Sequence, residues 1–316
     1  MANRKIIAVV GSTGAQGGGL ARAILADTSG EFAVRGLTRH VDSDKAKALQ
    51  AAGAEMVAAD LDDVDSLRRA FEGAYGAYCV TNYWEHFSGE KELVQAGNMA
   101  AAARHAGLKH VIWSTLEDVR TFYPLTDTRM PTIDGKYKVP HFDAKGEADA
   151  LFTEAGVPTT FLLAAFFWEN FIYFGSGPKP GPDGTLALTF PMRDSRMDGI
   201  AAEDVGRCAY GMFREGTKLV GQHIGISGDK LTIAEYAEAM TKALGRKVVY
   251  NSVTADAYRA FGFPGAVELG NMFQFYDECV KEVGDMRDVA RSRKLNPQLQ
   301  SFETWIKANA KRIPLE

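Results

Sequence analysis

Three glycines at a regular spacing stand near the start of the chain, in the stretch Gly11-Ser-Thr-Gly-Ala-Gln-Gly17. The apolar run at 6–10 before them predicts a buried strand, and Leu20, Ile24 and Leu25 after them have the spacing of a helix. A strand, a glycine turn and a helix in this order form a cradle for the pyrophosphate of a dinucleotide, which binds the unpaired N–H groups at the helix start. The alternative is a strand-to-helix turn that holds no ligand.

Each glycine of this turn has a separate physical task. Gly11 permits the tight turn, Gly14 lets the backbone approach the pyrophosphate, and Gly17 lets the helix pack closely on the strand. The residues that we expect to surround the cofactor in this turn are Gly11, Ser12, Thr13, Gly14, Gln16 and Gly17. The Gly-x-x-Gly-x-x-Gly spacing resembles that of the extended and atypical short-chain dehydrogenases/reductases.

An arginine takes the place of the acid that usually follows the second strand of a dinucleotide fold. An acidic side chain there accepts from the ribose 2′-OH of NAD, whereas an arginine pairs with the 2′-phosphate of NADP. Arg39 therefore predicts NADP(H) as the cofactor, with NAD(H) bound more weakly. Asp42 and Asp44 oppose a nearby phosphate and weaken this case, and the alternative is an ordinary surface arginine.

Polar and aromatic residues follow the third and fourth predicted strands, where ligands bind in open α/β sheets. Asp60 can accept from the adenine amino group while Leu61 packs on its ring, unless Asp60 only caps the next helix. The stretch Thr81-Asn82-Tyr83 is expected to lie along the cofactor, with Trp84 as a pocket wall. Packing in the core is the alternative for the two aromatic residues.

The stretch His141-Phe-Asp-Ala-Lys145 stands where short-chain dehydrogenases carry Tyr-x-x-x-Lys, and it follows Ser114-Thr115 at the end of a strand. Lys145 lies one helical turn after His141, so the two side chains share a face, and we expect Lys145 to contact the nicotinamide ribose. His141 can carry a proton near neutral pH, but it is shorter than the tyrosine acid. The alternative for His141 is a plain residue at a helix start, so whether the chain is an enzyme stays open.

The order of elements predicts the fold class. Strands are expected at 6–10, 33–38, 55–59, 77–81 and 110–114, and helices at 20–26, 46–52, 64–71 and 90–105. This alternation, with right-handed crossovers, predicts an α/β protein with a Rossmann-type, doubly wound parallel sheet.

The second half has a different pattern. The stretch 120–140 is rich in proline and has little periodicity, which is typical of a functional or mobile loop. Helices at 142–155, 202–213 and 233–244, strands at 159–163, 186–190, 223–226 and 248–252, and a mostly helical end from 256 predict a smaller α/β C-terminal lobe. We expect a Rossmann domain at 1–158, rejoined by strands near 159–163 and 223–227, and a discontinuous substrate or partner lobe at 164–316. The stretch 168–171 lines the cleft or the core, and 271–276 is the packing face of a helix.

Composition limits the classes of function. The 316 residues have 46% hydrophobic and 24% charged side chains and a net charge of −4, as in an ordinary globular protein without a basic nucleic-acid surface. Neither the three cysteines nor the histidines have metal-site spacing, and the most apolar stretch, 161–168, is too short to cross a bilayer. We expect reduced thiols, no metal, no membrane contact, no direct nucleic-acid contact, no signal peptide, and a location in the cytoplasm and also in the nucleus.

Taken together, these residues resemble the NmrA-like family of atypical short-chain dehydrogenases/reductases, in particular its HSCARG-type branch of NADPH sensors. The stretches that carry the resemblance are 10–17, 37–39, 60–63, 80–85, 141–147, 167–170, 197–199, 221–225 and 262–265. The stretches Asn-Tyr-Trp-Glu at 82–85 and His-Phe-Asp-x-Lys-Gly at 141–146 are the specific ones, because general short-chain dehydrogenases lack both.

The resemblance implies an NADP(H)-binding protein that lacks the tyrosine acid and acts by binding and conformational change. Fungal relatives bind a GATA-type transcription factor. Animal relatives respond to a change in the NADPH/NADP ratio by changing partners and oligomeric state. A redox sensor with a regulatory protein partner, and a homodimer, are therefore expected. Carried over by position, Arg39 holds the 2′-phosphate and Lys145 the ribose, but the basic cluster after the arginine is absent here. Some relatives reduce quinones, so an NADPH-dependent reductase of quinones or other small carbonyl compounds is the alternative.

Overall fold

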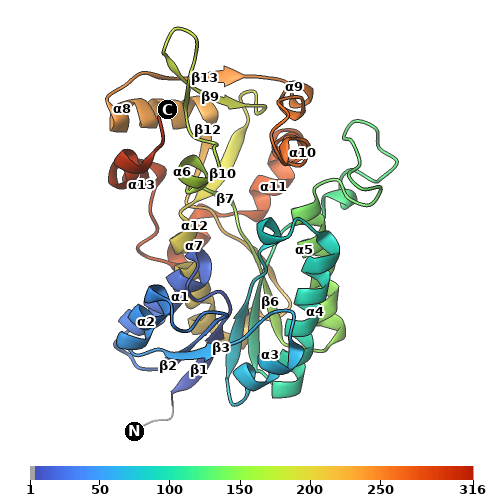
Figure 1. Cartoon of the computed structure of the whole chain (residues 1–316), viewed down its shortest axis with the longest axis vertical. Helices are drawn as coiled ribbons and strands as arrows, with labels where there is room; N and C mark the ends of the chain where they lie inside the picture. Colours follow the sequence, from blue (N-terminus) through green and yellow to red (C-terminus); the bar gives the residue numbers. More distant parts are fainter. Residues whose placement is uncertain (1–3, 316) are drawn as a thin grey trace.

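The computed structural model describes residues 4–315. Its centre is a seven-stranded parallel sheet, seen in the lower half of Figure 1, with the strand order β11-β6-β5-β4-β1-β2-β3. The strands are β1 (Lys5–Val9), β2 (Phe32–Thr38), β3 (Glu55–Ala58), β4 (Gly76–Cys79), β5 (His110–Thr115), β6 (Thr159–Leu163) and β11 (His223–Gly225). The strand order reverses at β1, next to β4, which is the arrangement of a doubly wound sheet. The predicted fold class is confirmed.

Helices cover both faces of this sheet. On one face the core joins α1 (Ala15–Ala26), α2 (Asp44–Ala51), α7 (Ala202–Glu215) and α12 (Val289–Leu295). On the other face it joins α3 (Val64–Phe71), α4 (Gly89–Ala106) and α5 (Pro140–Glu154). The apolar strands predicted from the first half of the chain are thus buried between two layers of helix.

Helices α1 and α7 approach each other through glycine. A Cβ atom added to Gly19 would lie 2.4 Å from the carbonyl oxygen of Glu203, and one added to Gly206 would lie 2.2 Å from the amide nitrogen of Leu20. Such distances leave no room for any side chain, so the two backbones touch. The contact ties the helix that follows the glycine turn to a helix nearly 200 residues later in the chain.

The C-terminal lobe stands beyond the sheet, in the upper half of Figure 1. It contains two three-stranded sheets, β12-β10-β7 and β13-β9-β8. Their strands are β7 (Phe166–Phe167), β8 (Lys179–Pro180), β9 (Leu186–Phe190), β10 (Arg196–Ile200), β12 (Asp229–Thr232) and β13 (Val248–Ser252). The helices are α6 (Asn170–Tyr173), α8 (Ile233–Leu244), α9 (Ala255–Arg259), α10 (Ala266–Glu278), α11 (Val280–Met286) and α13 (Phe302–Asn309). The strands β7, β8, β10 and β12 were not expected from the sequence.

An aromatic core fills this lobe. Trp168 is fully buried, its ring packs on Phe302 and Trp305, and its indole N–H donates to the hydroxyl of Tyr236 at 3.2 Å. Of the two sequence interpretations of Trp168, a cleft wall or a core residue, the core residue is therefore the one that the structure supports. Asn271 to Tyr276 lie on α10 and are buried, as the predicted packing face requires.

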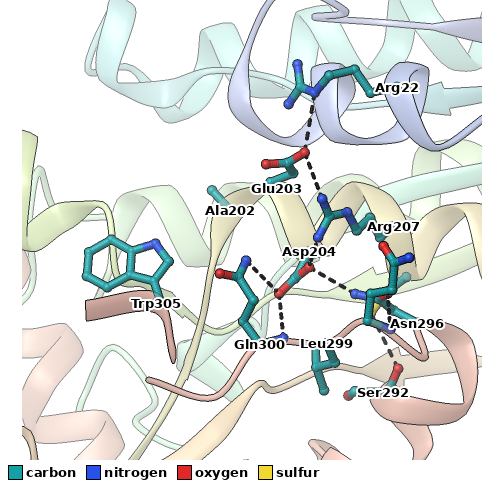
Figure 2. A network of polar contacts seen from close by, with 12 residues as sticks. Arg22, Ala202, Glu203, Asp204, Arg207, Ser292, Asn296, Leu299, Gln300 and Trp305 are labelled. Carbon is teal, nitrogen blue, oxygen red and sulfur yellow. Dashed lines mark hydrogen bonds and ion pairs between the residues drawn. The ribbon is translucent and has the colours of Figure 1, made fainter. Parts of the chain in front are cut away.

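A buried carboxylate at the start of α7 binds the segment 296–300, which leads into α13 (Figure 2). Asp204 is completely buried and accepts from Arg207 Nη1 at 3.1 Å, from Asn296 Nδ2 at 3.0 Å and from the Gln300 amide at 3.0 Å. Next to it, Glu203 is partly exposed and pairs with Arg207 and with Arg22 of α1. The network therefore links α1, α7 and the segment that leads into α13.

Candidate functional site

The glycine turn has the geometry that its three glycines predict. Gly11 has a φ of +62°, in the left-handed region that favours glycine. A Cβ atom on Gly17 would lie 2.5 Å from the Gly11 carbonyl oxygen and 2.6 Å from that of Val10, so helix and strand pack too closely for a side chain. A Cβ atom on Gly14 would meet only the Gly11 oxygen, at 3.2 Å, so its outer side is open.

The start of α1 is left without an internal partner. Over the part of the chain that the structure describes, no side chain caps this helix, and its first turn contains no acidic residue. The first N–H groups of a helix need an acceptor, and together with the helix dipole they form an anion site. The turn and the helix start therefore fit the diphosphate of a dinucleotide.

Two polar residues of the turn hold it in place. Ser12 is completely buried, and its hydroxyl donates to the Leu37 carbonyl of β2 at 3.1 Å, so its side chain fixes the turn, while the contact of Ser12 with a cofactor stays a prediction. Gln16 Oε1 accepts from the Tyr78 hydroxyl at 2.6 Å and from Ser114 Oγ at 2.9 Å. Burial raises the pKa of Tyr78 well above its usual range, which keeps this hydroxyl a donor.

Arg39 faces acids other than those expected from the sequence. It forms an ion pair with Glu85, and about half of each side chain is exposed to solvent. The hydrogen bond with Glu85, followed by the charges of Glu85, Asp60 and Asp62, raises the pKa of Arg39. Asp42 and Asp44, which the sequence placed against a phosphate, do not appear among these partners, and Asp44 lies in the first turn of α2.

Residues after β3 lie beside this arginine. Asp60 and Leu61 are half-buried, and Asp60 Oδ1 accepts from the amide of Asp62 at 2.9 Å. The cap of α3 is Asp63, which accepts from two amides, so Asp60 is not the cap. The adenine contact of Asp60 and Leu61 stays a prediction.

Lys145 lies at the carboxyl ends of β4 and β5, largely buried. Its Nζ is 2.5 Å from Thr81 Oγ1 and 2.7 Å from Glu92 Oε2, and it lies over the Trp113 ring at 5.5 Å. Glu92 comes from the first turns of α4 and is almost completely buried, and its partner Thr81 donates to it at 2.7 Å. Sequence reasoning missed Glu92, because a glutamate near a helix start is usually solvated.

His141 is held by a residue of the C-terminal lobe. Glu268 Oε1, from α10, accepts from the His141 amide at 2.9 Å and contacts its Nδ1, while Oε2 accepts from the Tyr83 hydroxyl at 3.1 Å. The His141 ring also packs on Tyr83 and, with ring centroids 4.8 Å apart, on Trp84. Among the described residues, no hydrogen bond reaches His141 Nε2.

Electrostatics shift the pKa values of Glu268 and Tyr83 in this cluster. Burial alone would raise the pKa of Glu268, but the charge and hydrogen bonds of His141 outweigh it and lower that pKa. Burial, and then the nearby Glu268 carboxylate, raise the pKa of Tyr83, so it stays a neutral donor. Glu268 lies 127 residues from His141, and its position in an apolar helix gave no signal in the sequence.

The glycine turn, Arg39, Asp60 with Leu61, and the stretch 81–83 follow β1, β2, β3 and β4, so all of them lie at the carboxyl edge of the parallel sheet. Lys145 and His141 reach this edge through Thr81 and Tyr83. Thr13 is half-buried and Asn82 is exposed. Within residues 4–315, no three histidine, cysteine or acidic side chains are grouped as metal ligands. A search of the same residues for a helix long and apolar enough to cross a membrane finds none.

Comparison with known proteins gives a consistent result. The model of the NmrA-like family matches residues 3–306. The NmrA-like family domain-containing oxidoreductase FrzB of Cladobotryum sp is 29% identical over 292 residues, which cover 85% of this chain and 83% of that protein. An NmrA-like family domain-containing protein of Dictyostelium discoideum is 26% identical over 313 residues, covering 96% and 97% of the two chains.

Solved structures agree with the sequences. The negative transcriptional regulator NmrA in complex with NADP has a TM-score of 0.77 and 25% identity, covering 96% of this chain and 94% of that chain. Its complex with NAD has a TM-score of 0.78, with the same identity and coverage. The Citrobacter sp. triphenylmethane reductase complexed with NADP(H) has a TM-score of 0.71 at 19% identity, over 98% and 100% of the two chains, and so shares the fold. The chain belongs to the NmrA-like family.

Proposed function

We propose that this chain binds a nicotinamide dinucleotide, NADP(H) in preference to NAD(H). The glycine turn and the open start of α1 would hold the diphosphate, Arg39 the 2′-phosphate and Lys145 the nicotinamide ribose. The residues at 81–83 would lie along the cofactor, with Asp60 and Leu61 at the adenine. The NmrA complexes support this proposal, since one holds NAD and another NADP.

We infer that the chain senses the redox ratio of this cofactor and regulates a partner protein, as the HSCARG-type branch does. The observation that carries this inference is the Glu268 carboxylate. It joins Tyr83 and His141, which lie in the expected cofactor wall, to α10 of the C-terminal lobe. A ligand that binds better to one arrangement of this contact shifts the population toward it.

The stretch 119–139 extends this contact to the surface. It covers most of the stretch 120–140 that the sequence predicts to be a loop, and it is anchored on α10, where Asn271 Nδ2 donates to the Pro131 and Lys138 carbonyls at 2.9 and 2.6 Å. Lys138 is buried, and its Nζ donates to the carbonyls of Asp127 and Met130. A change at Glu268 would therefore reach a surface that a partner or a second copy of the chain can contact. Cytoplasm and nucleus are the compartments that we propose for such a regulator.

Calorimetry with NADP+, NADPH, NAD+ and NADH tests binding, and hydrogen exchange of α10 and 119–139 tests the response. We expect saturable binding, and exchange rates that differ between NADP+ and NADPH. Glu268→Gln should keep the binding and lose the difference, while Glu282→Gln, an exposed acid on α11, should keep both. Equal exchange patterns with the reduced and oxidised cofactor would end the redox-sensor proposal, and absence of binding by all four nucleotides would end the whole assignment.

A second candidate is an NADPH-dependent reductase of quinones or small carbonyl compounds. The observation in its favour is that Glu268 fixes one side of the His141 ring and leaves Nε2 without a protein partner among the described residues. A carboxylate that orients an imidazole in this way prepares it to give a proton. NADPH consumption should then fall at least about 100-fold in His141→Gln. If the wild-type chain consumes NADPH no faster than Lys145→Ala, the reductase is excluded.

A further inference from the structure

A three-residue helix connects the adenosine side of the site with the C-terminal lobe. In η1 (Tyr83–Glu85), three consecutive side chains contact three different parts of the molecule. Tyr83 donates to Glu268 of α10, and Trp84 packs on His141 and, at 6.1 Å between ring centroids, on Phe174 of the C-terminal lobe. Glu85 pairs with Arg39 at the end of β2.

The second residue beyond this element is held in a strained conformation. Phe87 has a φ of +53°, although its side chain is large, and its amide donates to the Tyr83 carbonyl at 2.7 Å. More than half of the Phe87 side chain is exposed, while its ring packs on Tyr83 and Trp84. Strain of this kind is retained at sites that change conformation. Turning η1 would therefore displace its aromatic contacts together.

The Glu85 carboxylate occupies the Arg39 guanidinium, which is the group that a 2′-phosphate would bind. A carboxylate and a phosphate both bind a guanidinium through oxygen atoms, so they compete for the same donors. The pair is exposed on both sides, at 53% for Arg39 and 46% for Glu85, and exposed pairs are weak. A phosphate dianion bound to Arg39 would displace the carboxylate and also repel it.

We propose that Glu85 is an internal substitute for the 2′-phosphate, and that only nucleotides carrying this phosphate displace it and turn η1. The displacement would loosen the Tyr83–Glu268 and Trp84–Phe174 contacts. The conformation of the C-terminal lobe would then depend on the ratio of nucleotides with a 2′-phosphate to nucleotides without one. The inference rests on the proposed cofactor binding. It goes beyond the redox ratio, because NADP+ and NADPH carry the same 2′-phosphate.

Binding of paired ligands tests the competition. We would titrate the full chain with NADP+ against NAD+, and with adenosine 2′,5′-bisphosphate against 5′-ADP, by calorimetry. Glu85→Gln should tighten both 2′-phosphorylated ligands roughly fivefold and leave the other two within about twofold, since one weak exposed pair is removed. Arg39→Gln should weaken the 2′-phosphorylated ligands by at least about tenfold and abolish the effect of Glu85→Gln. Glu90→Gln, an exposed acid paired with Lys136, is the matched control.

Hydrogen exchange tests the transmission to the lobe. NADP+, NADPH and adenosine 2′,5′-bisphosphate should raise exchange at 83–87 and at the start of α10, while NAD+ and 5′-ADP should not. Glu85→Gln should show the raised exchange without any ligand. The proposal is overturned, with cofactor binding left standing, if Glu85→Gln alters all four affinities equally or if NAD+ and NADP+ give the same exchange pattern. A wild-type chain that binds none of the nucleotides overturns both the inference and the proposed function.

Discussion

Helices α1 and α7 touch along one face of the sheet, yet they differ in whether the protein supplies acceptors and negative charge at their N-termini. At α7, Glu169 accepts from the Ala202 amide at 2.9 Å, and the first turn holds Glu203 and the buried Asp204. At α1, the described residues provide neither a capping side chain nor an acid in the first turn. The same partial positive charge is therefore balanced by the protein in one helix and left for a ligand in the other.

The comparison shows how a stable fold carries an unsatisfied site. An uncapped helix start costs about 1 kcal/mol, and a buried carboxylate network beside it is expensive to break. The glycine contact between α1 and α7 lets the satisfied helix hold the unsatisfied one in place. Substitutions at the two helix starts should therefore separate stability from binding.

The largest effect is expected from Gly206→Ala. The added Cβ would meet the Leu20 amide nitrogen at 2.2 Å, and neither backbone can move without separating the two helices. We expect the free energy of unfolding to fall by more than about 3 kcal/mol, measured by urea denaturation. Gly97→Ala, whose added Cβ has an atom no nearer than 3.9 Å, is the control and should be neutral or slightly stabilising. Equal stability of the two variants would contradict the tight contact.

Asp204→Asn should remove the charge at the start of α7 and replace one of its two acceptor oxygens by an NH2 donor. Either the Arg207 and Asn296 donors or the Gln300 donors then lose their acceptor. We expect a loss of about 3 kcal/mol in the free energy of unfolding, because the network is buried. The affinity for NADP+ should stay within about threefold of the wild-type value, since α1 is untouched. A proportional loss of affinity and stability would show that the two helix starts are not independent.

Gly17→Ala should weaken the binding of NADP+ at the start of α1. The added Cβ would lie 2.5 Å from the Gly11 carbonyl oxygen and push the turn out of shape. We expect the affinity for NADP+ to fall about 100-fold, which corresponds to about 2.7 kcal/mol. Thermal unfolding with and without NADP+ measures it: the ligand should stabilise the wild type and Asp204→Asn but not Gly17→Ala. Full ligand stabilisation of Gly17→Ala would contradict the assignment of the cradle.

The smallest effect is expected from Glu203→Gln. Glu203 pairs with Arg22 and Arg207 on an exposed surface, and such pairs contribute little. The free energy of unfolding should change by less than about 0.5 kcal/mol and the affinity for NADP+ should be unchanged. A loss comparable with that of Asp204→Asn would mean that the exposed part of the network in Figure 2 matters as much as the buried part.

Local signals allowed the Rossmann-type sheet to be predicted. The strands of the sheet lie within two residues of their predicted bounds, because apolar runs between turn residues report burial directly. Strands such as β7 and β8 have only two residues each and depend on pairing with distant partners, so no periodicity marks them. The element order was therefore clear in the first half of the chain and incomplete in the second.

The candidate site was predictable where one stretch of sequence builds it. The glycine turn and Lys145 could be named from residue types and their spacing within one stretch, and their contact with a cofactor stays a prediction. Glu92 and Glu268 could not, because each becomes part of the site only when another element brings Lys145 or His141 to it. The hydrogen bond from the Ser12 hydroxyl to the Leu37 carbonyl could not be predicted either, because it depends on how closely the turn lies to β2.

The position of β11 at the edge of the parallel sheet has a consequence for biosynthesis. Its three residues, His223–Gly225, pair with β6 only after most of the chain has left the ribosome, and α12, which packs on α7, follows later still. The parallel sheet therefore cannot be completed until the segment at 223–225 has been synthesised, long after the strand β1. Nascent chains that stop before this point will expose the edge of β6, and we expect them to depend on chaperones.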